Sequence, residues 1–88
     1  MNGPPRQLRV ALADDQALVR AGLRALLERH GVTVAFEAED GQGLLDALQL
    51  QPVDVVLSDI RMPGLDGITA LRELREAGDR TPVLLLTT

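Results

Sequence analysis

The 88-residue sequence predicts a single α/β domain built on a doubly wound parallel sheet. Short apolar runs, typical of buried strands, alternate along the chain with segments whose apolar residues recur every three or four positions, as in amphipathic helices. Strands that are separated by helices pair in parallel through right-handed crossovers. The composition is 45% hydrophobic and 25% charged, which is ordinary for a globular domain and too apolar for a disordered chain.

The predicted order of elements is β-α-β-α-β-α-β. The first strand is an apolar run over residues 8–13 that ends at Asp14 and Asp15, and a β-branched and aromatic run predicts the second over 32–38. The third, over 53–58, is almost continuously apolar, as expected of a strand that is covered on both faces. The fourth is expected over 82–88.

Three helices are expected between these strands. The first ends at Gly31, the second before Pro52 and the third near Gly78. Asp40 and Asp66 are expected to cap the second and third helices, because an Asp side chain at a helix start accepts hydrogen bonds from free backbone N–H groups. The residues expected to face inward, helix by helix, are Val19, Leu23, Leu26, Leu27 and His30; Leu44, Ala47 and Leu48; and Ile68, Leu71 and Leu74.

Composition excludes several classes of function. All nine basic residues are Arg, and thirteen acidic residues leave a net charge of −4, so we expect no direct contact with nucleic acid or an anionic membrane. Cys is absent, which excludes disulfides and thiolate metal sites. No apolar run has the length of a membrane span and no secretory signal is recognisable, so a cytoplasmic location is expected. One domain is expected at 8–88, after a tail at 1–7 that contains the start of the first strand and is disordered over 1–5.

Three acidic residues follow the ends of two predicted strands. Asp14 and Asp15 come after the first strand and Asp59 after the third, 44 positions beyond Asp15. Ligands of open parallel sheets bind outside the carboxyl ends of the strands, so these acids share one pocket if the two strands are neighbours. Three carboxylates repel one another unless a cation joins them, and Mg²⁺ is a hard ion that takes oxygen ligands.

Each of these residues also has a simpler interpretation. Asp14 or Asp15 can cap the first helix, which for an isolated Asp pair is the more frequent role. Asp59 is followed by a loop at 60–65 rather than by a helix and has no evident structural duty, which favours the cation site. Thr87, at the end of the fourth strand, has a hydroxyl that can donate to a phosphoryl oxygen, or it is there for its strand propensity alone.

Three segments resemble the receiver domain of bacterial two-component response regulators: Asp14-Asp15, residues 58–67 (SDIRMPGLDG) and residues 86–88 (LTT). Residues 18–23 (LVRAGL) and 37–41 (EAEDG) further resemble the NarL/FixJ type, whose members usually carry a C-terminal helix-turn-helix. The resemblance covers essentially everything after residue 7. It implies a flavodoxin-like (CheY-like) doubly wound parallel sheet that lacks the C-terminal third of the receiver, with its fifth strand and last helices.

The resemblance implies a role for each matching residue. Asp59 corresponds to the phosphoacceptor, which takes a phosphoryl group from a phosphohistidine of a sensor histidine kinase in the presence of Mg²⁺. Asp15 corresponds to a direct metal ligand, Asp14 to an acid that acts mainly through metal-bound water, and Arg61 to a ligand through its backbone carbonyl. Thr87 corresponds to the switch hydroxyl. The residues expected to shape the loop after the phosphoacceptor are Met62, Pro63, Gly64 and Gly67, of which Pro63 fixes φ and Gly67 permits a close approach.

The expected function is therefore that of a phosphoacceptor that controls a DNA-binding output domain outside this sequence. It is not classed as an enzyme, although it assists its own phosphorylation and dephosphorylation. One alternative is a docking or dimerisation module that is never phosphorylated. Another is a Mg²⁺-dependent aspartyl-phosphate phosphohydrolase, which needs a second acid two positions after Asp59, where Arg61 stands.

One departure from the family affects the expected behaviour of this chain. A complete receiver has a Lys at the end of its fifth strand that pairs with the phosphoryl group, and this sequence contains no Lys. The fourth strand is free of charge, and an edge strand of that kind leaves backbone groups unpaired beside an apolar face. Self-association through the fourth strand or the uncovered sheet face is therefore expected.

Overall fold

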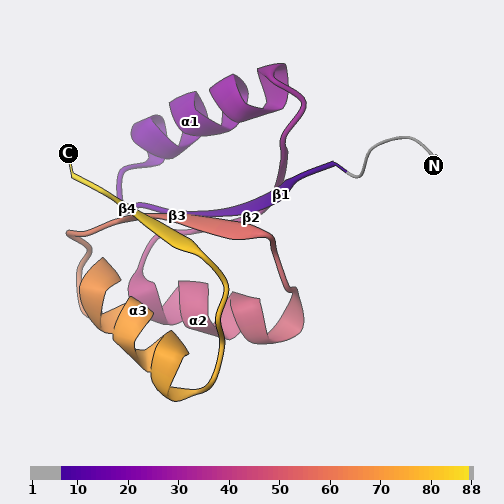
Figure 1. The fold of residues 1–88 in the computed structure, drawn as a ribbon. Coiled ribbons are helices and arrows are strands. Elements are labelled where there is room, and N and C mark those ends of the chain that lie inside the picture. Colours follow the sequence, from indigo (N-terminus) through magenta and orange to yellow (C-terminus); the bar gives the residue numbers. More distant parts are fainter. Residues whose placement is uncertain (1–6, 88) are drawn as a thin grey trace, which may run out of the picture.

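The computed structural model describes residues 7–87, so the disorder expected at 1–5 and residue 88 of the expected fourth strand lie outside the described residues. The elements are β1 (Arg9–Ala13), α1 (Ala17–Arg29), β2 (Thr33–Ala38), α2 (Gly41–Leu50), β3 (Val55–Asp59), α3 (Gly67–Glu76) and β4 (Val83–Leu86). All strand pairs are parallel, in the order β2-β1-β3-β4. Figure 1 shows α1 on one face of the sheet and α2 and α3 on the other, which confirms the predicted architecture. Within residues 7–87, every helix is too short or too polar to span a lipid bilayer.

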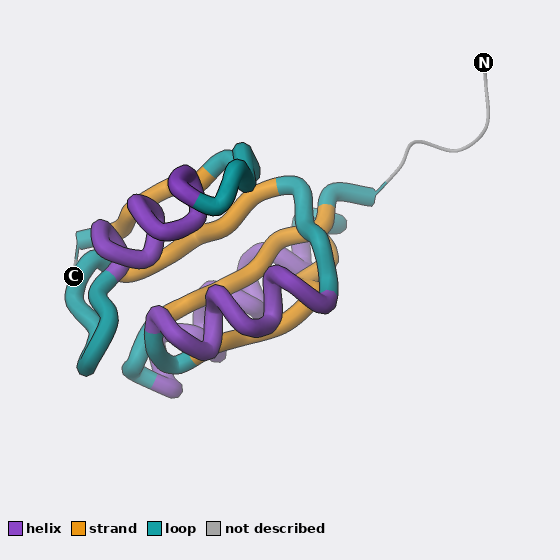
Figure 2. The backbone as a smooth tube through the Cα atoms, turned by 90° about the horizontal axis from the view of Figure 1, so that it is seen from below, coloured by secondary structure: helices purple, strands orange, loops and turns teal. Residues whose placement is uncertain are grey.

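The sheet divides the core into two apolar clusters. Seen from below in Figure 2, α2 and α3 lie in front of the sheet and run along its strands. Side chains alternate along a strand, so successive β1 residues pack into opposite clusters. Residues 10–13 of β1 are each at most 2% exposed. The buried residues toward α2 and α3 are Ala11, Ala13, Ala38, Leu44, Leu48, Val56, Met62 and Leu74. Those toward α1 are Val10, Leu12 and Val34.

Helix α1 covers its face of the sheet less completely than its periodicity predicts. Leu23 and Leu27 pack against the cluster on that side, but Leu26 is 52% exposed and His30 is exposed. The expectation that Leu26 and His30 face inward is wrong, because α1 is the single described helix on this face and contacts the sheet along only part of its apolar stripe. Ile68 of α3, also expected inward, is 46% exposed.

The predicted caps of α2 and α3 are confirmed. Asp40 accepts a hydrogen bond from the N–H of Gly43 at 2.7 Å, and Asp66 accepts one from the N–H of Thr69 at 2.7 Å. Hydrogen bonds from the backbone and the hydroxyl of Thr69 hold the pKa of Asp66 below its ordinary value. Both caps satisfy N–H groups that the first turn of a helix leaves without a partner, and they therefore fix where each helix begins.

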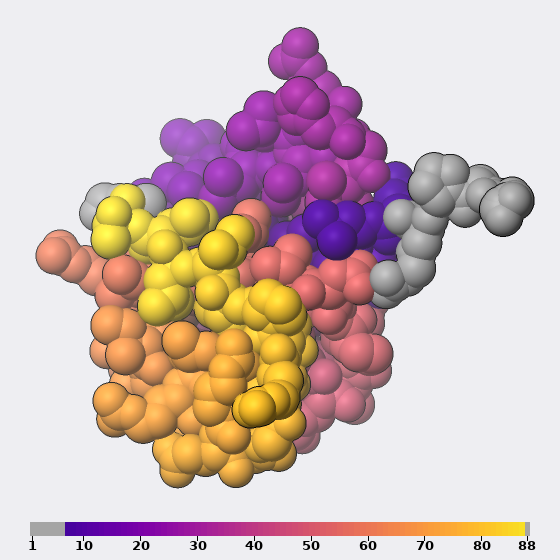
Figure 3. Space-filling view, viewed as in Figure 1, coloured from indigo at the N-terminus to yellow at the C-terminus, as the bar shows by residue number. Residues whose placement is uncertain are grey.

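Strand β4 lies at an edge of the described sheet. Leu84 is opposite Leu57 of β3, so both side chains emerge on the face that α1 occupies. Leu84 is 58% exposed, because α1 lies over β1 and β2 and does not extend to this strand. In Figure 3 the β4 segment, coloured yellow, lies at the surface. Leu57 and Leu84 therefore form an apolar strip beside the edge of the sheet.

Candidate metal centre

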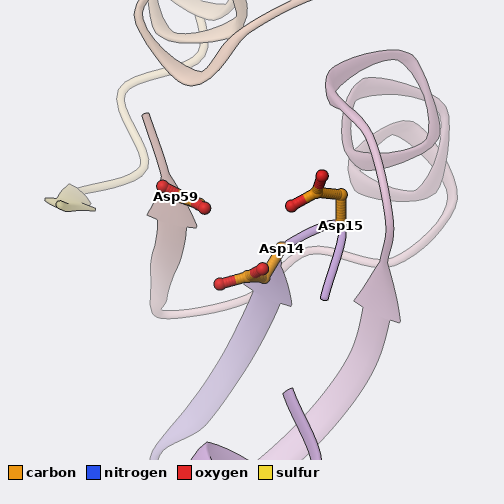
Figure 4. Close-up of side chains that lie close together, drawn as sticks. All are labelled: Asp14, Asp15 and Asp59. Carbon is orange, nitrogen blue, oxygen red and sulfur yellow. The ribbon is translucent and has the colours of Figure 1, made fainter. Parts of the chain in front are cut away.

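The strand order brings the three predicted acids together. β1 and β3 are neighbours, and Ala13 is opposite Ser58, so Asp14 and Asp59 are the next residues at the same edge. Carboxylate oxygens of Asp14, Asp15 and Asp59 all lie within 4.8 Å of one another. Figure 4 shows these side chains at the carboxyl ends of the two strands. The sheet thus gathers the acids in one pocket, as the sequence predicts for neighbouring strands.

The burial of this cluster favours a cation. Asp14 and Asp59 are each 2% exposed, whereas Asp15 is exposed to solvent. Asp14 Oδ2 is buried and has no hydrogen-bond partner among the described residues. A buried carboxylate oxygen without a donor carries a large desolvation cost, which a bound cation removes. Carboxylate oxygens with one side open to water are the donor set that Mg²⁺ takes in proteins, so these residues fit that ion.

Asp14 is held at three of its polar atoms. Its N–H donates to the carbonyl of Ala38 at 3.0 Å, and its own carbonyl accepts a hydrogen bond from Arg20 Nη1. Asp14 Oδ1 accepts a hydrogen bond from the N–H of Gln16 at 2.8 Å. Gln16 is the N-cap of α1 and makes no side-chain cap bond. One oxygen of Asp14 therefore supports the turn before α1, while the other is buried without a hydrogen-bond partner among the described residues. The interpretation of Asp14 or Asp15 as the cap of this helix is wrong, because the N-cap is Gln16 and no described side chain caps the first turn.

The loop after Asp59 is anchored by backbone hydrogen bonds. Asp59 Oδ1 accepts from the N–H of Arg61 at 3.2 Å. The N–H of Ile60 donates to the carbonyl of Leu86 at 3.0 Å, and the N–H of Gly67 donates to the carbonyl of Ile60 at 2.9 Å. These bonds hold the loop between β4 and the start of α3, so the carboxylate of Asp59 starts from a fixed backbone.

The other loop residues singled out in the sequence lie beside the cluster. Arg61 and Pro63 are exposed and line, together with Asp15, an open hollow of about 460 Å³. Met62 is only 8% exposed and packs into the core toward α2 and α3. Gly64 has a φ of +72°, in the left-handed region that disfavours a side chain. The loop therefore exposes Arg61 and Pro63 beside the site and buries Met62 as an apolar anchor.

Thr87 lies at the same edge of the sheet. It is exposed and comes one residue after Leu86, which is opposite Asp59. The order of the strands thus brings its backbone next to the strand that carries the acid. Its role as a switch hydroxyl stays a prediction, as does ligation by the carbonyl of Arg61.

Reasoning from the sequence missed Arg20. Its Nη1 donates to the carbonyl of Asp14 and its Nε to Glu37 Oε1 at 3.0 Å, so it connects the acid cluster to β2. A signal was present, because Arg20 and Glu37 lie in the two segments, 18–23 and 37–41, that resemble one subtype of receiver. That signal indicated kinship and did not indicate a contact.

The fold and the site together define a class, the α/β domains of the CheY-like fold with an acidic centre at the carboxyl ends of two adjacent strands. The chain belongs to the response regulator receiver domain family, whose model matches residues 10–88. The signal receiver domain of NarL from Mycobacterium tuberculosis superposes with a TM-score of 0.89 at 37% identity, over 94% of this chain and 68% of that one. A LuxR-family two-component response regulator from Aurantimonas superposes with a TM-score of 0.87 at 34% identity, over 93% and 59%.

Similarity to full-length regulators is confined to one part of them. An uncharacterised transcriptional regulatory protein of Bacillus subtilis, YxjL, is 40% identical over 83 residues, which are 93% of this chain and 38% of that protein. The transcriptional regulatory protein QseB of Escherichia coli is 40% identical over 91% of this chain and 36% of its own length. The chain thus spans about two fifths of the curated relatives that it matches. These comparisons confirm the family and the NarL-type kinship that the sequence motifs predict.

Replacement of Gly67 tests the close approach of α3 to the site. A Cβ at Gly67 would collide with the carbonyl oxygen of Asp59 and lie 3.2 Å from Ile60 Cα, and these are backbone atoms that cannot rotate away. We expect Gly67→Ala to lower the free energy of unfolding by about 1–3 kcal/mol in urea denaturation. Gly22→Ala is the control, because nothing lies within 4 Å of that Cβ in α1. It should raise stability by about 0.5–1 kcal/mol, and equal stability of Gly67→Ala and the wild type would contradict the packing described.

Removal of one charge tests the repulsion within the cluster. We expect Asp59→Asn to stabilise the metal-free protein by about 1–2 kcal/mol, because a negative charge leaves a buried acidic cluster. The amide oxygen of the variant can still accept from the N–H of Arg61. Thermal unfolding with and without Mg²⁺ should show a larger stabilisation by the ion in the wild type than in Asp59→Asn. Asp46→Asn, at an exposed acid of α2, is the control and should change neither quantity; equal stabilisation of wild type and Asp59→Asn by Mg²⁺ would contradict the site.

Proposed function

We propose that this chain is the phosphoacceptor domain of a two-component response regulator, and that Asp59 takes a phosphoryl group from a phosphohistidine of a sensor histidine kinase. The observation that carries the proposal is the convergence of Asp14, Asp15 and Asp59 within 4.8 Å in a receiver-family fold. Asp59 ends a central strand, and the adjoining hollow opens to solvent, where a partner can present its phosphoryl group.

The chemistry proposed for the site is a single group transfer. A bond forms between a carboxylate oxygen of Asp59 and phosphorus while the phosphorus–nitrogen bond of the phosphohistidine breaks, and the electron pair of that bond stays on the imidazole nitrogen. The ligands proposed for Mg²⁺ are the side chains of Asp14, Asp15 and Asp59 and the carbonyl of Arg61. When bound, Mg²⁺ neutralises negative charge on the phosphoryl group. The N–H of Arg61, which donates to Asp59 Oδ1 at 3.2 Å, orients the nucleophilic carboxylate.

The reaction proposed is stoichiometric, with one phosphoryl group accepted per chain, and this separates the domain from a phosphohydrolase. A hydrolase of the aspartyl-phosphate kind needs an acid two positions after its nucleophile, and Arg61 occupies that position here. A docking module that is never phosphorylated has no need of a buried carboxylate oxygen without a donor, which Asp14 retains. Both observations favour the acceptor.

The consequence proposed for phosphorylation is a change at the edge of the sheet. An acyl phosphate adds negative charge and acceptor oxygens, which attract donors such as the hydroxyl of Thr87. Relatives described as transcriptional regulatory proteins are more than twice as long as the matched region, which covers 38% of one of them. For the whole protein we therefore propose a cytoplasmic regulator in which this domain controls a DNA-binding output domain, while the acidic chain itself makes no contact with DNA.

Incubation of the whole protein with Mg²⁺ and acetyl phosphate tests the proposal. We expect one phosphoryl adduct by intact-mass spectrometry, mapped to Asp59 and released by hydroxylamine, as acyl phosphates are. Asp59→Asn and chelation of the metal should both abolish the adduct, whereas Asp46→Asn should retain it. Rapid release of phosphate over many turnovers, without accumulation of the adduct, would favour the hydrolase instead. The absence of any adduct and of any phosphate release would favour the docking module.

We also propose that the 88-residue chain self-associates through β4 and the apolar strip beside it. Leu84 is 58% exposed on this strip, where two copies could cover each other. Light scattering at rising concentration should give a mass above that of the monomer, and Leu84→Gln should shift the equilibrium toward monomer. Leu50→Gln, at a Leu that is 87% exposed on α2, is the control and should leave the mass unchanged. A well-folded wild-type monomer at high concentration would contradict the proposal.

A further inference from the structure

Arg20 is the one cationic side chain that reaches the backbone of the acid cluster in the described part of the chain. It is the fourth residue of α1, and helical side chains tilt toward the N-terminus, which carries its guanidinium back over the turn between β1 and α1. There Nη1 donates to the carbonyl of Asp14, and Nε donates to Glu37 Oε1 at 3.0 Å. The Arg20 side chain is 17% exposed, and its hydrogen bond to the carbonyl of Asp14 is partly buried.

We propose that Arg20 is a positioning residue for the cation site: anchored on Glu37, it holds the carbonyl of Asp14 so that Asp14 Oδ2 stays directed into the acid cluster. The proposal deepens the proposed function and rests on it. Arg20 bonds to the backbone of Asp14 and makes no hydrogen bond to the cluster's carboxylate oxygens among the described residues. It therefore leaves the ligand atoms to the metal.

The anchor of Arg20 is itself well placed. Glu37 is opposite Leu12 in the pairing of β2 with β1, one residue before the pair that Ala38 makes with Ala13. Glu37 is thus next to the carbonyl of Ala38, which accepts the N–H of Asp14. A hydrogen bond from Arg24, with a further one from Arg20, holds the pKa of Glu37 below its ordinary value. Glu37 is therefore an anion at neutral pH and can pair with the guanidinium.

Arg24 provides a matched control for the role of Arg20. It lies one turn further along α1 and pairs with the same Glu37, and it also bonds to Glu28 at 3.2 Å. It makes no hydrogen bond to Asp14. Arg20→Met and Arg24→Met each remove one positive charge and one ion pair to Glu37, but only the first removes the support of the Asp14 carbonyl.

Charge and position act on metal affinity in opposite directions, and this makes the test decisive. A positive charge near the cluster repels Mg²⁺, so loss of the charge alone strengthens binding. Loss of the support under Asp14 weakens binding, because a ligand atom that is no longer held in place must be ordered when the ion arrives. The sign of the change in Arg20→Met therefore separates the two effects.

Mg²⁺ affinity, measured by titration of backbone amide NMR shifts in the whole protein, is the first readout. We expect Arg20→Met to bind about tenfold more weakly than the wild type, and Arg24→Met to remain within about twofold. Arg20→Lys should recover only part of the loss, because an ammonium keeps the charge but not the fork that reaches both Asp14 and Glu37. Equal or tighter binding by Arg20→Met would overturn the proposal, as would an equal loss in Arg24→Met.

Hydrogen exchange in the metal-free protein is the second readout, and it does not depend on the ion. The N–H of Gln16 is held by Asp14 Oδ1 at 2.8 Å, so its exchange reports whether Asp14 is fixed. We expect this amide to exchange faster in Arg20→Met than in the wild type, and to exchange at the wild-type rate in Arg24→Met. A wild type that binds no Mg²⁺ would refute the proposed function and this inference with it. A wild type that binds, with unchanged affinity and Gln16 exchange in Arg20→Met, would refute the role of Arg20 alone.

Discussion

The structure depends on keeping two carboxylates, those of Asp14 and Asp59, away from water at the ends of adjacent strands. Burial of a carboxylate without full compensation carries a penalty on the order of several kcal/mol, and the two charges also repel each other. β1 pairs with β2 on one side and β3 on the other, and its residues 10–13 are nearly inaccessible, so the strand ends are fixed by the core. The folding free energy of the core thus offsets the cost of the site, and the acids are preorganised before any ligand arrives.

Both layers of the domain contribute to this preorganisation. On the side of α1, Arg20 and the turn before the helix hold the backbone and one oxygen of Asp14. On the other side, the N–H of Gly41 at the start of α2 donates to the carbonyl of Leu65 at 3.2 Å, and Gly67 packs against the backbone of Asp59. The loop between Asp59 and α3 therefore cannot move without disturbing the first turn of a helix. A charge change at this site acts on elements that are already in contact with it.

The helix caps are predictable from sequence because their signal is local. Asp40 and Asp66 each accept a hydrogen bond from an N–H in the first turn of the helix that they precede. Both partners lie three residues along the chain, so an Asp before an amphipathic segment is enough to identify the cap. The meeting of Asp59 with the first-strand acids depends on which strands are neighbours, and periodicity leaves that open. Leu26 was misplaced because apolar spacing reports a stripe on a helix and not how much of the stripe the sheet covers. Arg20 was missed because an Arg on a half-exposed helix looks like a solvated charge until the fold brings a buried carbonyl within its reach.

The elements around the site differ in how completely they are buried. β1 is buried on both faces and paired on both sides, whereas β4 pairs with β3 alone among the described strands and leaves Leu84 largely exposed. The N–H of Ile60, next to Asp59, donates to Leu86 at the end of β4 at 3.0 Å, and Thr87 follows directly. Regions with little burial open at lower free energy than the core. The backbone next to Asp59 is therefore joined to the end of β4 by the N–H of Ile60, and the described part of β4 is less buried than β1.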